Sequence, residues 1–288
     1  MGIKYLNRYI SERCKDSLKH IHFCDLQNKT IVVDISIYMY KFRLANALIE
    51  NIYIMLSLFE RNNINPIFIF DGKPPPEKKN MLNQRYLERI SAEEEYSRVC
   101  EKMHDNKIGH QERVALEAEL QHLRRKCVYI TKKEIQQIKD FISIYGYTWY
   151  QSPGEADDLC SLFVKQKKAW ACLSEDMDMF VQGTPRVLRY FSLVNSSCVL
   201  YDTRDILRHM NITQEEFTYV CILCGTDYNV ECSNNVYNIF DMFRAFVSSN
   251  TNKNNRIYSF INTIQNNPEC QVTDKERLQS IYNLFTNT

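Results

Sequence analysis

Three apolar runs that each end in acidic residues constrain the fold of this chain more than any other feature of its sequence. The runs are rich in β-branched or aromatic residues, as the buried strands of a parallel sheet are. The runs and the acids after them are residues 30–33 before Asp34, 66–70 before Asp71, and 169–173 before the sequence SEDMD at 174–178. Helical patterns at 53–60 and 134–145 separate these runs. The alternation predicts an α/β fold with a mostly parallel, twisted sheet and helices on both faces.

The carboxyl ends of these strands are the predicted site, because open parallel sheets bind their ligands there. A single aspartate at a strand end is usually a helix N-cap or a turn former. Carboxylates that converge within about 4–6 Å, however, disfavour each other's ionisation unless a cation compensates their charge. Repeated delivery of acids to one edge therefore favours a site for divalent metal.

Two further stretches supply candidate ligands. Glu155, Asp157 and Asp158 occupy the predicted first turn of a helix, where acids also complement the helix dipole. Asp227 follows Gly225 at the end of an apolar helix, where a C-cap and turn is the alternative interpretation. All these ligands are oxygens, which suit Mg²⁺ or Mn²⁺ better than zinc.

Composition sets broad limits. The chain has 288 residues, enough for one large α/β domain or one domain with a small appendage. Its net charge of +1 provides no general basic field, so nucleic-acid binding requires locally segregated charge. No apolar segment predicts a signal peptide or a membrane span. The 11 scattered cysteines indicate reduced thiols and a cytoplasmic location. Cys221 and Cys224 lie in an apolar run without a second pair, which favours core cysteines over zinc ligands.

Six short motifs stand in a characteristic order along the chain. They are the Met-Gly-Ile start, VVDISIYMYKF at 32–42, IFDGKPP at 69–75, GEADD at 154–158, SEDMD at 174–178 and GTDY at 225–228. From Met1 to about Tyr228 the chain thus resembles the flap endonuclease–XPG family of structure-specific 5′ nucleases. Few glycines and many Asn, Ile, Lys and Tyr residues are typical of an AT-rich genome. A poxvirus-like member, acting in the host cytoplasm, is therefore expected.

The resemblance implies a 5′-nuclease fold of the PIN type. Its nuclease core would span 1–225, with a helical arch at about 76–130, and a helical C-terminal region would span 226–288. Two Mg²⁺ ions, with Mn²⁺ as a substitute, would be held by seven acids. These implied ligands are Asp34, Asp71, Glu155, Asp157, Asp176, Asp178 and Asp227.

Three acids depart from the family pattern or stand outside its ligand set. Asp157 replaces the second glutamate of the family's E-A-E motif, and its shorter side chain suggests a water-mediated contact. Asp158 stands where the family usually has a small residue, and its role is open. The side chain of Glu175 should point to the opposite face of the strand end from Asp176 and Asp178.

The implied reaction is Mg²⁺-dependent hydrolysis of DNA at 5′ flaps or junctions by two metal ions, leaving a 5′-phosphate and a 3′-hydroxyl. Such an activity serves DNA replication, repair or recombination, with proteins of those processes as partners. One alternative is an RNase that degrades messenger RNA. Another is a non-catalytic DNA-binding scaffold, but the presence of all seven carboxylates argues against it.

Lys78 and Arg85 match the basic pair of the family's gateway helix and are candidate catalytic residues beside Asp176 and Asp178. Seven residues apart, they should share one helix face, although a solvated basic face is the plainer interpretation. Tyr40 matches an aromatic on which the family stacks a base, where a core tyrosine is the default. The other implied DNA contacts are Gly2, Lys73, Lys79, Arg124, Arg125, Lys126, Lys132 and Lys133.

Two regions have less familiar sequences. Residues 88–127 are charged, have a helical period and little apolar face, so they should bridge solvent or be mobile; in the family such a stretch is the arch that the 5′ single strand passes. After Asp227 the family usually has a glycine-rich helix-hairpin-helix loop, but residues 228–243 contain no glycine. A degenerate version of this loop, followed by a small helical appendage, is therefore expected. No sliding-clamp motif is seen.

Overall fold

The computed structural model describes residues 3–103, 109–229, 232, 234–249, 255–265, 267, 270–272 and 274–286. The predicted DNA contact Gly2 and three positions of the loop after Asp227 (230, 231 and 233) lie outside the described residues.

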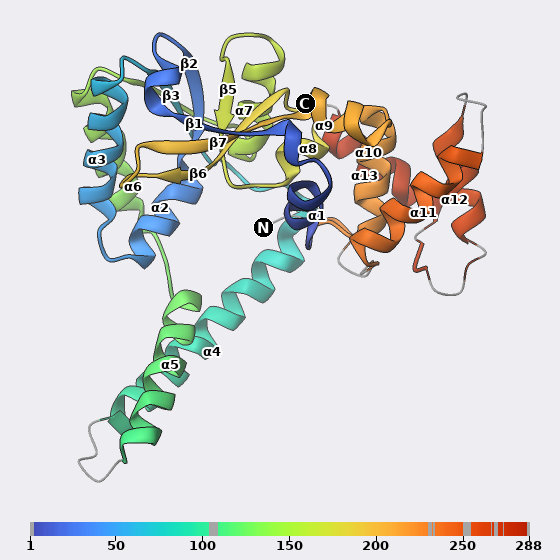
Figure 1. The fold of residues 1–288 in the computed structure, drawn as a ribbon. Helices are drawn as coiled ribbons and strands as arrows, with labels where there is room; N and C mark the ends of the chain where they lie inside the picture. The colour runs from blue at the N-terminus through green and yellow to red at the C-terminus, as the bar shows by residue number, and fades with distance from the viewer. Residues whose placement is uncertain are drawn as a thin grey trace.

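A seven-stranded mixed sheet forms the centre of the fold, in the order β1-β7-β6-β5-β2-β3-β4 (Figure 1). The five strands from β6 to β4 run parallel, and β7 and β1 are added antiparallel at one edge. The strand bounds are β1 Leu18–His22, β2 Thr30–Asp34, β3 Asn65–Phe70, β4 Thr148–Gln151, β5 Ala171–Leu173, β6 Arg186–Ser192 and β7 Ser197–Asp202. The predicted α/β fold with a mostly parallel sheet is confirmed.

Helices cover both faces of the sheet (Figure 1). Their bounds are α1 Leu6–Arg13, α2 Ile35–Leu44, α3 Leu48–Arg61, α4 Lys79–Met103, α5 His110–Lys126, α6 Lys132–Ile144, α7 Ala156–Lys165, α8 Asp178–Val181, α9 Thr203–Met210, α10 Gln214–Cys224, α11 Val236–Ser249, α12 Arg256–Gln265 and α13 Lys275–Thr286. Sequence-local signals start several of them. At the start of α6, for example, Thr131 and Glu134 form a reciprocal capping box.

The strand β2 shows how the sheet divides two cores. Val32 belongs to the apolar cluster with α1, α7 and α10, whereas Ile31 and Val33 belong to the cluster with α2, α3 and α6. Successive side chains of a strand point to opposite faces, so this central strand is buried on both sides. Burial on both faces explains why its sequence is a continuous apolar run rather than an alternating one.

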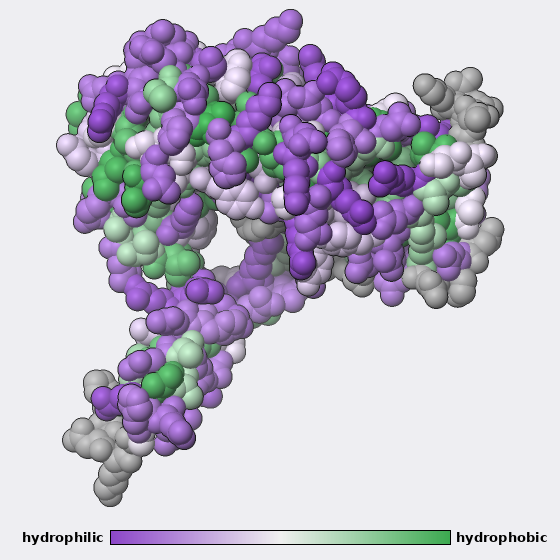
Figure 2. All heavy atoms as spheres, viewed as in Figure 1, coloured by the Kyte–Doolittle hydropathy of each residue, from purple (hydrophilic) through white to green (hydrophobic). Residues whose placement is uncertain are grey.

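Helices α4 and α5 form an antiparallel hairpin that projects from the body (Figure 1). Little apolar face was expected for this stretch, but the two helices share a narrow apolar seam of their own. Its buried members are Ala92, Val99, Leu116 and Leu123. Figure 2 shows an opening between this hairpin and the body. We call the hairpin, residues 79–126, the arch.

The C-terminal helices pack onto the sheet's own core. Residues of α11, α12 and α13 lie in the same apolar cluster as α1 and α10, and the rings of Tyr9 and Phe240 stack at 4.7 Å between centroids. Helix α10 is buried on every side from Glu216 to Cys224, and Cys221 and Cys224 are core residues as predicted. The division at residue 225 stays a prediction.

Two other expectations concern the whole chain. All 11 cysteines are free thiols, and seven of them are buried. Within the described ranges, no helix has the length and apolar character needed to cross a bilayer.

Candidate metal centre and nucleic-acid interface

The strand-end acids meet at one edge of the sheet because β3, β2 and β5 are adjacent and parallel. Asp34 is the last residue of β2, and Asp71 directly follows β3. Asp176 lies in the short segment after β5, and Asp178 is the first residue of α8. The topology therefore brings together acids that are more than 100 residues apart in sequence.

The other predicted ligands reach this edge through close backbone packing. Gly72 lies so near the segment before α7 that a Cβ there would be 1.8 Å from the Ser152 carbonyl oxygen. This approach lets Asp71 Oδ1 accept a hydrogen bond of 2.9 Å from the Ala156 amide at the start of α7. Glu155 and Asp157 are then beside Asp71, at the N-cap and in the first turn of α7.

Asp227 is placed by the end of α10. Gly225 closes that helix with φ +97°, and a Cβ there would be 2.0 Å from the Cys232 carbonyl oxygen. Only glycine fits such a position. The turn that follows directs Asp227 towards Arg85 of α4, with 3.5 Å between Nη2 and Oδ2.

Electrostatics link these acids into one cluster. Burial, followed by the charges of neighbouring acids, raises the pKa of Asp34, Asp157 and Asp178 well above the usual range of aspartate. The acids whose charges act on these three are Asp71, Glu155, Asp158, Asp176, Asp178 and Asp227. Each of the seven predicted ligands, and Asp158, therefore interacts electrostatically with at least one other acid of the cluster.

The cluster has the chemistry of a site for hard divalent cations. Its donors are carboxylate oxygens, which Mg²⁺ and Mn²⁺ prefer. Asp178 Oδ1 is buried without a hydrogen-bond partner among the described groups, and a buried anionic oxygen left in this way needs a compensating charge. As the side chains stand, no three His, Cys, Asp or Glu residues in the described part of the chain are gathered closely enough to hold an ion.

Both predicted gateway bases contact this cluster, but the expectation of a shared helix face was wrong. Lys78 ends a 3-10 turn, residues 76–78, that precedes α4, because three consecutive prolines delay the start of the helix. Its Nζ lies 2.6 Å from Glu155 Oε2 and 4.9 Å from the ring centroid of Tyr228. Burial opposes its charge, but Glu155 and Tyr228 raise the pKa of Lys78 overall. Arg85 lies on α4 itself and pairs with Asp227.

The other predicted basic contacts lie on exposed surface. Lys73 and Lys79 are on either side of the proline turn, Arg124, Arg125 and Lys126 end α5, and Lys132 and Lys133 begin α6. The last five therefore flank the strap, residues 127–131, that joins the arch to the body. These five residues were expected to form one basic stripe on phosphates, and their role in DNA binding stays a prediction.

Tyr40 is half exposed rather than a core tyrosine. Burial raises its pKa, and the next contributions come from Asp71 and Tyr129, so its ring lies near both the acid cluster and the strap. The Arg89 guanidinium lies 4.7 Å from the ring centroid of Tyr129. Neither Arg89 nor Tyr129 was expected, because their contact forms only when the arch folds back to the body.

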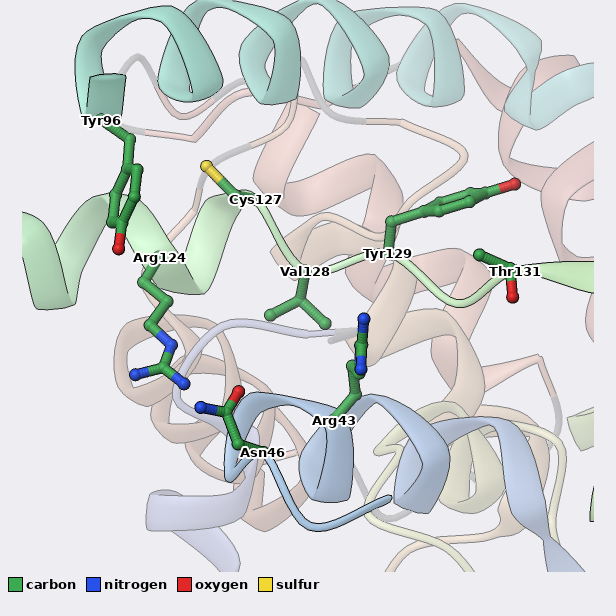
Figure 3. Close-up of a pocket in the computed structure, with 8 residues that line it drawn as sticks. All are labelled: Arg43, Asn46, Tyr96, Arg124, Cys127, Val128, Tyr129 and Thr131. Atoms are coloured by element: carbon green, nitrogen blue, oxygen red, sulfur yellow. The ribbon is translucent and has the colours of Figure 1, made fainter. Parts of the chain in front are cut away.

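A pocket of about 380 Å³ continues from Tyr129 along the base of the arch (Figure 3). Two guanidinium groups and two phenol rings line it, without an acid among its lining residues. The lining residues are Arg43, Asn46, Tyr96, Arg124, Cys127, Val128, Tyr129 and Thr131. Arginine and aromatic side chains together are the groups that hold single-stranded nucleic acid.

Gln182 is a further residue that sequence reasoning missed. Its Nε2 donates hydrogen bonds to Asp157 Oδ2 at 3.2 Å and to Asp158 Oδ1 at 2.9 Å. Asp158, whose role was open, is thus tied to a predicted ligand through Gln182. Burial and then the Glu155 charge raise the pKa of Asp158 to about 6. No local signature marks such a glutamine, because its partners lie 24 and 25 residues away.

Comparisons with known proteins agree with this geometry. The model of the XPG N-terminal domain matches residues 1–92 and that of the XPG I-region matches 146–227, so together they cover more than half of the chain. Flap endonuclease 1 of Glycine max is 28% identical over 247 residues, which are 79% of this chain and 62% of that protein. The Bos taurus protein of the same name is 26% identical over 246 residues, with the same two shares. The chain therefore spans less than two thirds of the length of these relatives.

Solved structures share the fold. The catalytic core of Rad2 in complex with DNA substrate matches with a TM-score of 0.70 at 16% identity, over 99% of this chain and 86% of that one. Human GEN1 in complex with Holliday junction DNA matches with a TM-score of 0.68 at 16% identity, over 99% and 66%.

Flap endonuclease-1 from Methanococcus jannaschii matches with a TM-score of 0.62 at 19% identity, over 93% of this chain and 81% of that one. The closeness to poxvirus members stays a prediction. With both family models matched in order along the sequence, and the acids of their motifs gathered at one sheet edge, the chain belongs to the flap endonuclease–XPG family.

Proposed function

We propose that this protein is a divalent-metal-dependent endonuclease that cuts DNA at 5′ flaps or at junctions of single and double strands, in replication, repair or recombination. One observation carries the proposal: a cluster of acids with unbalanced charge lies at the sheet edge, with Lys78 and Arg85 directed into it. Such an arrangement suits a phosphodiester, whose hydrolysis needs both cations and fixed positive charge.

The residues that would hold two Mg²⁺ or Mn²⁺ ions are those of the acid cluster. They are Asp34, Asp71, Glu155, Asp157, Asp176, Asp178 and Asp227. Ions held there would supply an activated water and stabilisation of the leaving oxygen. The fit rests on the all-oxygen donor set and on the buried, unbonded Oδ1 of Asp178.

The chain's own bases would act on the scissile phosphate. The raised pKa of Lys78 keeps its ammonium charged at neutral pH, and Arg85 cannot lose its charge. Each is held by an acid of the cluster, Lys78 by Glu155 and Arg85 by Asp227. On exchange of those carboxylates for phosphate oxygens, both bases would stabilise the charge that builds up during the reaction.

The single strand would leave the acid cluster past Tyr40 and Tyr129 towards the pocket at the base of the arch. Both aromatic rings and guanidinium groups lie along this route, as in sites for single-stranded nucleic acid. The exposed bases at the end of α5 and the start of α6 would add contacts to phosphates. Structures of Rad2 and GEN1 with DNA support DNA as the substrate class.

The test is cleavage of matched flap, nick and gap substrates made of DNA and of RNA, with Mg²⁺, Mn²⁺ or EDTA. We expect cutting of DNA flaps or junctions with either ion and none in EDTA. Preferred cutting of the RNA set would favour the RNase alternative. Tight junction binding without cutting under any condition would favour the scaffold alternative, and both results would contradict the proposal.

A further inference from the structure

The segment 174–178 carries Asp176 and Asp178, and its internal hydrogen bonds set the two acids relative to each other. Ser174 Oγ donates to Asp34 Oδ2 at 3.1 Å and accepts from the Asp176 amide at 3.2 Å. The Asp178 amide donates to Asp176 Oδ1 at 3.1 Å. One end of the segment is thus held to the body through Asp34 of β2, and the Ser174 amide donates to the Leu188 carbonyl oxygen of β6 at 3.2 Å. A second attachment lies further along the segment.

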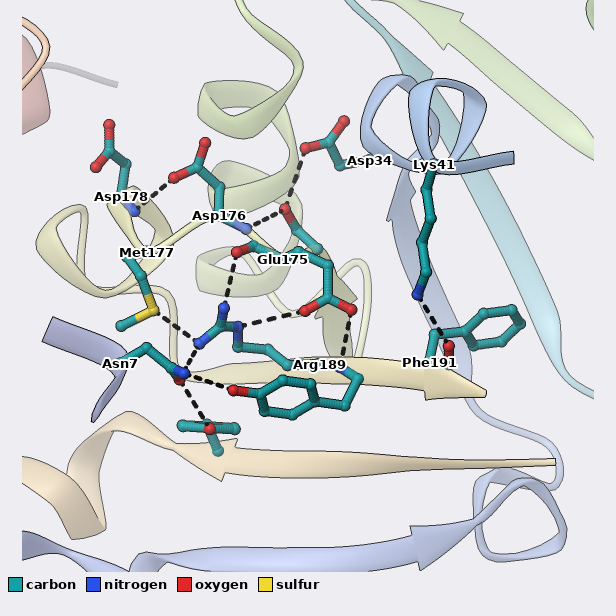
Figure 4. A network of polar contacts seen from close by, with 12 residues as sticks. Asn7, Asp34, Lys41, Glu175, Asp176, Met177, Asp178, Arg189 and Phe191 are labelled. Carbon is teal, nitrogen blue, oxygen red and sulfur yellow. Dashed lines mark hydrogen bonds and ion pairs between the residues drawn. The ribbon is translucent and has the colours of Figure 1, made fainter. Parts of the chain in front are cut away.

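Arg189 of β6 makes that attachment from beneath the segment (Figure 4). Its Nη2 donates to the Glu175 carbonyl oxygen at 2.9 Å, and its Nη1 donates to Met177 Sδ at 2.8 Å. The guanidinium therefore holds the alternate residues Glu175 and Met177. Asp176 and Asp178, one position on from each, are left to face the acid cluster.

Glu175 completes the attachment through its side chain. Its carboxylate accepts a hydrogen bond of 2.8 Å from the Tyr190 amide and lies 3.8 Å from Arg189 Nε. Tyr190 has φ +54°, and the pairing of β6 with β7 changes register between Arg189 and Ser192. Bulges of this kind re-aim side chains beside active sites, and here the bulge accompanies an arginine that is turned inward, only 6% exposed.

Asn7 links the same arginine to the N-terminal helix α1. Its Oδ1 accepts hydrogen bonds from Arg189 Nη1 and, at 3.1 Å, from the Tyr201 hydroxyl. Its Nδ2 donates to the Tyr190 hydroxyl at 2.5 Å. We call Asn7, Glu175 and Arg189 the arginine network. It joins α1, β6 and the segment after β5, which are far apart in sequence.

Burying the guanidinium of Arg189 costs desolvation free energy that an apolar core residue would not. Arg189 is nearly fully buried, its Nε has no hydrogen-bond partner among the described groups, and its one carboxylate lies 3.8 Å away. Its other contacts are hydrogen bonds to uncharged groups and the rings of Tyr190 and Tyr201, whose centroids lie 5.4 and 5.5 Å away. Buried charges with such partners can often be replaced by apolar residues of similar volume without loss of stability. Stability alone is therefore a weak reason for its place under the two acids.

We propose that Arg189, Glu175 and Asn7 are positioning residues, which hold Asp176 and Asp178 at the spacing that a divalent cation requires. The inference rests on the proposed function and deepens it. Groups that orient metal ligands through hydrogen bonds typically contribute 10–100-fold to metal affinity or activity. Unlike ligands, they do so without touching the ion.

The test compares two buried arginines. Arg256 of α12 is 9% exposed and pairs with Glu216 of α10 at 2.6 and 2.7 Å, with no contact to the acid cluster in these hydrogen bonds. Arg189→Met and Arg256→Met remove the same group from the two places. Mn²⁺ binding is measured by electron paramagnetic resonance of free Mn²⁺, below the melting temperature of each variant, and junction-DNA affinity is measured in EDTA.

We expect Arg189→Met to weaken Mn²⁺ binding by about 10–100-fold, with DNA affinity in EDTA unchanged. Arg256→Met should lower the melting temperature and leave Mn²⁺ binding as in the wild type. Arg189→Lys restores one donor to the Glu175 carbonyl and should recover part of the loss. Should Arg189→Met not fold, Asn7→Ala takes its place, with an expected loss of about 10-fold.

Wild-type Mn²⁺ affinity in folded Arg189→Met or Asn7→Ala would overturn the inference alone. Equal losses in Arg189→Met and Arg256→Met would also overturn it, since they would indicate a general structural effect. A wild-type protein that neither binds Mn²⁺ nor cuts DNA would overturn the proposed function and the inference together.

Discussion

Two regions of this protein bury carboxylates, and they treat the charge in opposite ways. In the C-terminal helices, Glu216 receives two hydrogen bonds from Arg256, and these lower its pKa even though burial alone would raise it. At the sheet edge, burial raises the pKa of Asp34 and Asp178, and neighbouring acids raise it further. In the first region, the positive charge of Arg256 balances the negative charge of Glu216. The second has more acids than bases, and protons or a bound cation can balance the difference.

The difference separates a structural role from a functional one. A buried ion pair that is complete fixes how two helices dock, although it adds little stability over an apolar pair. A cluster of buried acids without matched bases lowers stability, and sites of this kind persist where activity requires them. The two ion pairs that do reach the cluster, from Lys78 and Arg85, offset part of the charge.

The largest expected effect is on the cleavage rate, which should depend on the acids of the sheet edge and not on Glu216 of the C-terminal helices. Asp176→Ala or Asp178→Ala should lower the single-turnover rate of flap cleavage by more than about 10³-fold, beyond the loss of one preorganised donor. Junction affinity in Ca²⁺ should stay close to that of the wild type, because the basic contacts remain. Glu216→Gln should cut normally while folded. Equal loss of cutting and binding in the aspartate variants would indicate a structural site instead.

The free energy of unfolding should instead depend strongly on the Glu216–Arg256 pair. Glu216→Gln leaves Arg256 buried without its anion, so the free energy of unfolding in urea should fall by about 3–5 kcal/mol. The double variant Glu216→Leu with Arg256→Met removes both charges and should recover most of that loss. If the double variant is no more stable than Glu216→Gln, the loss does not come from an unpaired buried charge.

The third prediction concerns the bases that meet the acid cluster. Arg85→Ala should reduce single-turnover cleavage by about 10²-fold, because its charge acts most strongly on the transition state. Arg125→Ala, at the exposed end of α5, should instead weaken junction affinity and reduce its salt dependence. The same modest affinity loss in both, with normal rates, would contradict the gateway role of Arg85.

The pH dependence of the metal-free protein gives a smaller effect of defined sign. The pKa of Asp158 is raised from 3.8 to about 6, so the native state holds this proton more tightly than the unfolded state does. Its contribution is most favourable below about pH 4 and is lost as pH rises through about 6. In EDTA, the wild type should lose about 1–2 kcal/mol relative to Asp158→Asn between pH 4.5 and 7. If the difference in unfolding free energy between the wild type and Asp158→Asn does not change with pH, the pKa of Asp158 is not raised in the native state.

The sequence predicted those parts of the structure whose pattern lies within a single strand or helix. Strands β2, β3 and β5 were predictable because central strands are continuous apolar runs, and their terminal acids came with them. The strand β4 was missed because three of its four residues are exposed, and β1 because its side chains are only partly covered. Lys78 does not lie on the predicted helix, because the three prolines before it delay the helix start to Lys79.

The rest depends on contacts between distant segments. Asn7 and Arg189 are separated by 182 residues, and neither has a neighbour in sequence that indicates the pairing. Gln182 reads locally as the end of a short helix, and Tyr129 as a loop residue. Their roles follow from the sheet order and from the return of the arch to the body, which no local pattern encodes.

The central claim is that the sheet edge holds unbalanced negative charge that a divalent cation relieves. The most direct measurement is the melting temperature at pH 8 of the wild type and Asp178→Asn, in EDTA and in millimolar Mn²⁺. We predict that the variant melts above the wild type in EDTA, because it lacks a buried, unbonded carboxylate oxygen. Mn²⁺ should stabilise the wild type, by about 2.7 kcal/mol at 100 times its dissociation constant, and the variant much less. Identical melting temperatures in EDTA, with the same response of both proteins to Mn²⁺, would contradict the claim.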